Sequence, residues 1–123
     1  MYALDTNAII YYIKEEASVV SVIERVYAEN VPIYISAMTV AELFIFPRLN
    51  DEEAGHIESF LQSVSIISMD SYIARNAGVL GKNHHLDIAD SVIAATALFT
   101  GSTLLTRNIR DFRKIPQLKI QKV

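Results

Sequence analysis

The chain opens with the stretch Tyr2-Ala3-Leu4-Asp5-Thr6-Asn7-Ala8-Ile9-Ile10, which decides the fold class. Its first three residues predict a short strand, and Asp5 is a favoured residue for capping a helix N-terminus. Apolar side chains then recur at helical spacing through Ile13. The chain therefore passes from a strand straight into a helix at an acidic residue, which is how an α/β unit begins.

The same alternation continues along the chain. Apolar spacing predicts helices over 17–29, 40–46, 52–63, 71–82, 86–98 and 108–114, and strands over 32–35, 65–69, 103–105 and 118–120. Pro47 should end the third helix near Phe46, and Asp51 should cap the fourth. This order predicts an α/β three-layer sandwich, with a central, mainly parallel sheet of four to five strands flanked by helices.

The composition indicates one compact globular domain over residues 1–123, with 51% apolar and 20% charged residues. No stretch approaches the roughly 18 apolar residues of a membrane span, and the first residues lack the basic region of a secretory signal. We therefore expect a cytoplasmic protein. The absence of cysteine excludes disulfides and thiolate ligands, which leaves any metal site to harder oxygen or nitrogen donors.

The net charge of −3 conceals an uneven distribution. Residues 1–106 hold five Lys and Arg against thirteen Asp and Glu, whereas residues 107–123 hold six against one. The basic residues are a candidate contact for phosphate, with a solvated helix and edge strand as the alternative. The candidates for substrate binding are Arg107, Arg110, Arg113 and Lys114.

Four acidic residues have surroundings that favour a site. Asp5 follows an apolar strand, and Glu42 lies in the longest apolar surround of any acid in the chain. Asp90 and Asp111 each stand three residues after a capping residue, where helix capping is the alternative role. Ligands of α/β sheets bind at the carboxyl ends of strands, where Asp5 and Thr106 are expected.

Several carboxylates that converge at one sheet edge repel one another unless a cation lies among them. Carboxylate oxygens suit a hard dication such as Mg²⁺ or Mn²⁺, which would leave positions for a phosphate oxygen and a water molecule. Such a site suits the hydrolysis of a phosphodiester bond. It would also allow a net-acidic protein to bind a polyanion.

Four motifs together resemble the PIN domain, and specifically the VapC-type toxin ribonucleases. They are Leu4-Asp5-Thr6-Asn7, Ala41-Glu42-Leu43, Asp90-Ser91-Val92-Ile93-Ala94-Ala95-Thr96-Ala97 and Leu105-Thr106-Arg107-Asn108-Ile109-Arg110-Asp111-Phe112. The resemblance runs from residue 1 to about residue 112. It implies a PIN fold and a Mg²⁺- or Mn²⁺-dependent endoribonuclease. Typical members of this family are homodimers paired with a small antitoxin, and an RNA-processing nuclease without an antitoxin is the alternative role.

The resemblance also implies a role for each site residue. Asp5, Glu42 and Asp90 would be the core metal-binding acids, and Asp111 the fourth and more variable one. The residues that would support them by hydrogen bonds are Thr6, Asn7, Thr106 and Asn108. Asp87 stands three residues before Asp90 and is the rival for its place.

Three other interpretations fit these residues less well. A receiver-like signalling domain would need Asp70 as its phosphoacceptor, but it would place paired acids after the first strand and has no use for Glu42 on a helix. A non-catalytic binding module would keep the fold without the acids. Adjacent His84 and His85 in a polar segment are more typical of solvated side chains than of a zinc site.

Overall fold

Five parallel strands form the centre of the molecule, which a computed structural model describes over residues 1–123. The strands are β1 (Tyr2–Leu4), β2 (Ile33–Ser36), β3 (Ser65–Ile67), β4 (Thr103–Thr106) and β5 (Lys119–Lys122). Their order is β3-β2-β1-β4-β5, and every neighbouring pair is parallel. The predicted fold class is confirmed, and the expected edge strand joins the sheet as β5.

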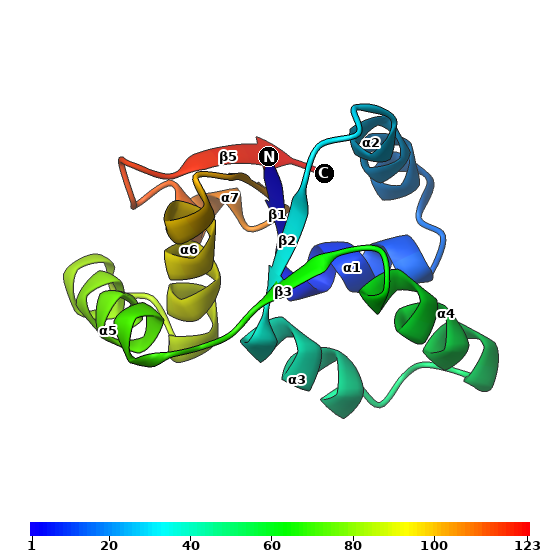
Figure 1. Cartoon of the computed structure of the whole chain (residues 1–123), viewed down its shortest axis with the longest axis horizontal. Helices are drawn as coiled ribbons and strands as arrows, with labels where there is room; N and C mark the ends of the chain where they lie inside the picture. Colours follow the sequence, from blue (N-terminus) through cyan, green and yellow to red (C-terminus); the bar gives the residue numbers. More distant parts are fainter.

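The helices form layers on both sides of this sheet (Figure 1). One side carries α1 (Thr6–Ile13), α2 (Ala17–Ala28) and α4 (Asp51–Leu61), and the other carries α6 (Ile88–Thr100) and α7 (Ile109–Phe112). Helix α5 (Ser71–His84) packs outside α6, while α3 (Ala37–Ile45) lies beyond the end of β2. No helix is long and apolar enough to cross a membrane.

Alternate residues of the central strands face opposite layers of the core. Leu4 and Leu105 join the apolar cluster formed with α1, α2, α3 and α4. Ala3 and Leu104 join a second cluster, formed with α6 and α7. Since both faces of a parallel sheet are covered, consecutive residues in the middle of these strands are apolar rather than alternating with polar residues.

The start of α4 differs from the prediction. Asn50, and not Asp51, caps this helix: its side chain accepts from the Glu53 amide at 2.8 Å, and the Glu53 carboxylate accepts from the Asn50 amide at 3.1 Å. This reciprocal capping box satisfies two free amides, so it prevails over a single acid at the next position. Asp51 becomes the first helical residue. The end of α3 at Ile45 agrees with the break expected before Pro47.

The strand order reverses between β1 and β4. From β1 the chain builds outward through β2 and β3 on one side, and β4 and β5 later fill the other side. Ligands of open parallel sheets bind at such a point, beyond the carboxyl ends of the strands. In this protein Asp5 follows β1 and Thr106 ends β4, so the fold brings two predicted site residues to that point.

Candidate active site

Asp5 lies at the centre of the candidate site and is only 5% exposed. Its Oδ1 accepts a hydrogen bond from the Ala8 amide at 2.8 Å, so Asp5 caps α1. Its Oδ2 accepts from the Thr106 hydroxyl. Burial raises the pKa of Asp5, while the bonds from Thr106 and Ala8 act in the opposite direction. The capping role and the site role therefore use different oxygens of one carboxylate.

Glu42 lies in α3 and is held by a residue of α1. The Thr6 hydroxyl donates to Glu42 Oε1 at 2.6 Å and lies 3.1 Å from Thr39 Oγ1. Thr39 is fully buried and stands one helical turn before Glu42. Sequence analysis missed Thr39, although the three-residue spacing from Glu42 places both on one helix face. Thr6 behaves as a supporting residue.

Asp90 occupies the first turn of α6 and is partly buried. The exposed Asp87 caps this helix by accepting from the Asp90 amide at 2.8 Å, so the Asp90 carboxylate is not needed as a cap. Burial, as the largest cause, and the negative charges of neighbouring acids together raise the pKa of Asp90 to about 6. In decreasing order of effect these neighbours are Asp87, Asp111, Asp5 and Glu42.

Asn108 lies between the last two acids. Its Nδ2 is 3.4 Å from Asp90 Oδ2, and its side chain also hydrogen-bonds to Asp111. Asn108 makes no side-chain capping bond to α7, so the capping role considered for it is not the one observed. The bond from Asn108, followed by Lys114 and Arg110, lowers the pKa of Asp111. Asp111 therefore ionises more readily than Asp5 or Asp90, whose pKa values are raised.

The four carboxylates share one electrostatic environment, as the combined effect of three of them on Asp90 demonstrates. No group of three acids or histidines is arranged to ligate one ion directly. An ion that keeps several of its waters and binds one or two carboxylates directly, as Mg²⁺ does, needs no such direct arrangement. The donors are all hard oxygens, and Asp90 is destabilised in its charged form. The residues present therefore fit a hydrated divalent cation.

The remaining predicted residues differ in whether they contact the candidate acids. The exposed Asn7 makes no side-chain hydrogen bond within the chain. The predicted hydrogen bond from Asn7 to the acids is therefore not observed. Arg110, whose side chain is 85% exposed, lies 3.8 Å from Asp111, and Lys114 lies 3.5 Å from it. Arg113 is exposed. Arg107 instead makes an ion pair with Glu16.

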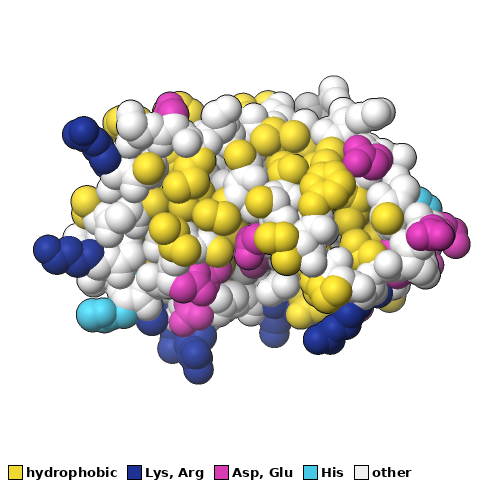
Figure 2. All heavy atoms as spheres, turned by 90° about the horizontal axis from the view of Figure 1, so that it is seen from below, with side chains coloured by type: hydrophobic (Ala, Val, Ile, Leu, Met, Phe, Trp, Pro, Cys, Tyr) yellow, Lys and Arg dark blue, Asp and Glu magenta, His cyan; other side chains and the backbone are white.

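The face beyond the carboxyl ends of the strands is largely hydrophobic. Figure 2 views the molecule from below and shows hydrophobic side chains over much of this face, with acidic side chains among them and Lys and Arg mainly at its rim. The exposed hydrophobic residues of the protein include Phe44 and Ile45 of α3. Basic side chains at the rim are well placed to contact a polyanion that crosses toward the acids.

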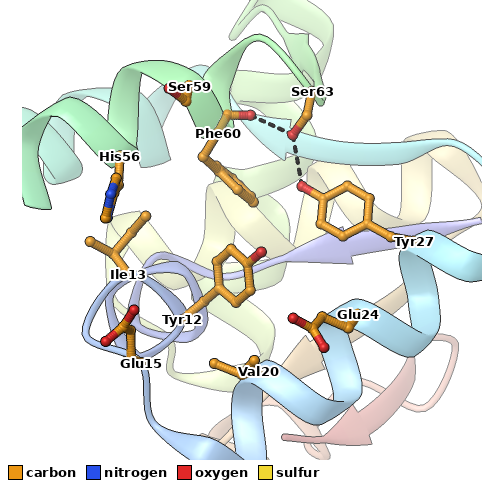
Figure 3. A pocket seen from close by; sticks show the side chains of 10 residues that line it. All are labelled: Tyr12, Ile13, Glu15, Val20, Glu24, Tyr27, His56, Ser59, Phe60 and Ser63. Atoms are coloured by element: carbon orange, nitrogen blue, oxygen red, sulfur yellow. Dashed lines mark hydrogen bonds between the residues drawn. The ribbon is translucent and has the colours of Figure 1, made fainter.

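A cavity of the protein lies away from the acids. It measures about 380 Å³ between α1, α2 and α4, and its lining includes Tyr12, Glu24, Tyr27 and His56 (Figure 3). None of the four candidate acids lines it. A phosphodiester has to reach those acids to react, so the open sheet edge is the candidate active site and the cavity is not.

The rival roles find no support in these positions. Asp70 caps α5 by accepting from the Ile73 amide at 2.9 Å, and it follows β3 at the edge of the sheet rather than a central strand. His84 and His85 end α5, with His85 in a left-handed conformation at the helix C-cap. Neither arrangement assembles the phosphoacceptor site or the zinc site that was weighed above.

The sequence is similar over almost its whole length to curated ribonucleases. Ribonuclease VapC2 of Rickettsia felis is 27% identical over 129 residues, which cover 98% of this chain and 96% of the relative. Ribonuclease VapC1 of Haemophilus influenzae is 29% identical over 131 residues, with the same coverage. The tRNA(fMet)-specific endonuclease VapC of Salmonella typhimurium is 25% identical over 128 residues, again with the same coverage.

Solved structures share the fold. In the crystal structure of VapBC2 from Rickettsia felis bound to a DNA fragment from its promoter, a chain 27% identical superposes with a TM-score of 0.82, covering 99% of this chain and 98% of that one. A toxin–antitoxin complex from Klebsiella pneumoniae gives 0.78 at 26% identity, covering 96% and 95%. The family model of the PIN domain matches residues 2–118. The chain belongs to the PIN domain family.

Proposed function

We propose that the protein is a metal-dependent endoribonuclease that hydrolyses RNA phosphodiester bonds, and that it is the toxin of a toxin–antitoxin pair. The observation that carries this proposal is the gathering of Asp5, Glu42, Asp90 and Asp111 at the reversal of strand order. There the charges of the other acids help to raise the pKa of Asp90 to about 6. Repulsion of this kind is relieved when a cation binds.

The relatives support the nature of the substrate and the partner. Proteins similar over almost the full length are named ribonucleases, and the structures include VapBC and toxin–antitoxin complexes. An RNA substrate and a small antitoxin follow from this similarity. Homodimer formation and a cytoplasmic location, both expected from the sequence, remain part of the proposal.

Mg²⁺ or Mn²⁺ is the proposed cofactor. Asp5, Glu42 and Asp90 would hold it as the main acids, partly through its bound waters, with Asp111 as the fourth acid. When bound, such an ion supplies positive charge toward phosphate oxygens and lowers the pKa of water.

The other residues of the chain hold these acids in place. Thr106 and the Ala8 amide fix the two oxygens of Asp5, and the Thr6 hydroxyl fixes Glu42. The side-chain amide of Asn108 orients Asp90 and Asp111. Partners of this kind tune metal sites nearly as strongly as the ligands themselves.

Contact with the RNA backbone is proposed for basic residues near Asp111. Arg110, Arg113 and Lys114 lie in or just after α7, at the rim of the acidic site. Their charges would offset the repulsion between the acids and a polyanion. This contact should weaken as salt concentration rises, since phosphate binding releases counterions.

The test of the proposed function compares two aspartates of one helical turn. Asp90→Asn should reduce RNA cleavage in Mn²⁺ by more than about 100-fold, since even supporting residues of metal sites cost about 10- to 100-fold. Asp87→Asn is the matched control, because asparagine caps a helix as well as aspartate does. It should stay within about threefold of wild type, and circular dichroism should show both variants folded. Full activity of folded Asp90→Asn would refute the proposal.

A further inference from the structure

Arg107 connects separate parts of the chain beside the acidic site. Its Nε donates to the Val123 backbone oxygen at 3.1 Å, and its Nη2 donates to Ser18 Oγ at 2.9 Å. The same Nη2 forms an ion pair with Glu16. The guanidinium carbon lies 4.4 Å from the centroid of the Tyr11 ring, in a cation–π contact. Four groups therefore hold one guanidinium.

These contacts leave little of the guanidinium for a phosphate. The side chain is only 32% exposed, one face is covered by an aromatic ring, and both Nε and Nη2 already have partners. The hydrogen bond and charge of Glu16 raise the pKa of Arg107, so the guanidinium stays charged. The prediction that Arg107 binds substrate therefore gives way to a different role.

The parts that Arg107 connects are those that create the Asp5 site. Arg107 follows Thr106, whose hydroxyl donates to Asp5 Oδ2. The oxygen of this hydroxyl also accepts from the backbone amide of Asn108 at 2.9 Å. Helix α1 begins immediately after Asp5 and carries Tyr11 one and a half turns later. Arg107 thus links the end of β4 to α1, which are the two elements that the bond from Thr106 to Asp5 also joins.

We infer that Arg107 is a positioning residue that clamps β4 onto α1 and so holds the Thr106 hydroxyl on Asp5. The inference rests on the proposed function, because it gives Arg107 a part in keeping the metal-binding carboxylate oriented. It also assigns a role to Glu16, which contacts neither the four acids nor Thr106. Glu16 anchors the guanidinium from the start of α2.

Glu16 provides the means to separate positioning from phosphate binding. If Arg107 bound RNA, Glu16→Gln would free the guanidinium and remove a negative charge, so RNA affinity would rise. If Arg107 positions Asp5, Glu16→Gln weakens the same clamp and resembles Arg107→Gln. The two roles predict effects of opposite sign from one conservative substitution.

The experiment compares Arg107→Gln and Glu16→Gln with Arg75→Gln, which removes the same charge as the first variant from an exposed position of α5. Amide hydrogen exchange is the primary measurement. The backbone amides of Ala8 and Asn108, which donate to Asp5 and Thr106 respectively, should exchange about tenfold faster in Arg107→Gln and Glu16→Gln, the two clamp variants. The amide of Ala94, in the middle of α6, should keep its wild-type rate, as should all three amides in Arg75→Gln.

Kinetics and metal binding give the second measurement. In both clamp variants kcat for RNA cleavage in Mn²⁺ should fall about tenfold, with KM within about twofold of wild type, and Mn²⁺ binding measured by calorimetry should weaken. Unchanged exchange at Ala8 and Asn108 would overturn the inference. So would a raised KM in Arg107→Gln together with tighter RNA binding in Glu16→Gln. If the wild type cleaves no RNA, the proposed function fails, and the exchange rates still decide the role of Arg107.

Discussion

The Thr106 hydroxyl donates a hydrogen bond to Asp5 across 101 positions of the sequence. The two residues end β4 and follow β1, which are neighbours in the sheet. Because the same hydroxyl oxygen accepts from the Asn108 amide, it also fixes the beginning of the segment that carries Asp111. One small buried side chain thus relates two of the proposed metal-binding acids.

Removing this hydroxyl should damage both activity and stability. Thr106→Val keeps the shape of the side chain but leaves Asp5 Oδ2 and the backbone amide of Asn108 without a partner. This loss should lower the free energy of unfolding by about 1–3 kcal/mol. RNA cleavage should fall about 10- to 100-fold. The matched control is Thr103→Val at the start of the same strand, which should change stability by less than about 0.5 kcal/mol. Urea unfolding and cleavage assays measure both, and equal behaviour of the two variants would contradict the role of Thr106.

The raised pKa of Asp90 predicts a specific pH dependence of stability. The folded pKa of about 6 lies above the usual 3.8, so the folded chain holds this proton more tightly than the unfolded chain. The resulting stabilisation is complete below the unfolded pKa and is lost as pH rises through about 6. In EDTA, Asp90→Asn should therefore gain stability relative to wild type between pH about 4 and about 7.5. The gain should be about 1 kcal/mol, allowing for solvent screening.

Urea unfolding at several pH values measures this difference, and added Mn²⁺ supplies the control. Mn²⁺ should stabilise wild type at neutral pH and have little effect on Asp90→Asn, because a ligand stabilises only the state that binds it. A stability difference between the two proteins that does not vary with pH would show that Asp90 is not destabilised by its surroundings.

Two glycines of α5 offer a matched test of how α5 and α6 pack. A Cβ on Gly81 would lie 2.7 Å from Ser91 Oγ and 3.3 Å from the Leu86 oxygen, whereas a Cβ on Gly78 has nothing within 4 Å. Gly78→Ala should stabilise the protein by about 0.5–1 kcal/mol through helix propensity. Gly81→Ala should destabilise it by about 1–3 kcal/mol through overpacking against the residue next to Asp90. Thermal and urea unfolding measure the sign of each change in the free energy of unfolding. Stabilisation by both substitutions would show that α6 can shift away from α5 at little cost.

The chemistry of cleavage can be determined from the ends of the products. Hydrolysis at an acidic, metal-dependent site should leave 5′-phosphate and 3′-hydroxyl ends, because water rather than the 2′-hydroxyl attacks. Activity should be lost in EDTA and should return with Mg²⁺ or Mn²⁺. It should also survive replacement of His84 and His85 by alanine. A ligase that needs those two ends should reseal untreated products, whereas 2′,3′-cyclic phosphates formed in EDTA would indicate imidazole catalysis instead.

The order of helices and strands follows from local patterns in the sequence. Apolar periodicity and the sharp signal at Pro47 place the elements within a few residues of where they lie. The start of α4 was misplaced because Asn50 and Asp51 are both good caps, and only the reciprocal bonds of Glu53 distinguish them. Local signals of equal strength leave a boundary undetermined until side chains are placed.

The contacts that complete the candidate site depend on tertiary structure. Spacing left helix capping open as the alternative role of Asp90 and Asp111, and only the structure shows that the side chain of Asn108 interacts with both carboxylates. The ion pair of Arg107 with Glu16 spans 91 positions, and no sequence period relates the two residues. A basic run near one end of a chain suggests phosphate contact on charge alone. Folding decides which of its members are already engaged by the protein itself.

The separation of β1 and β4 along the chain governs when the enzyme becomes active during its own synthesis. Asp5, Glu42 and Asp90 all leave the ribosome before β4 does, because that strand begins only at Thr103. Until β4 pairs with β1, no hydroxyl holds Asp5 and the fourth acid is missing. For a ribonuclease, this order of synthesis would keep the nascent chain inactive until β4 has been made and can pair with β1.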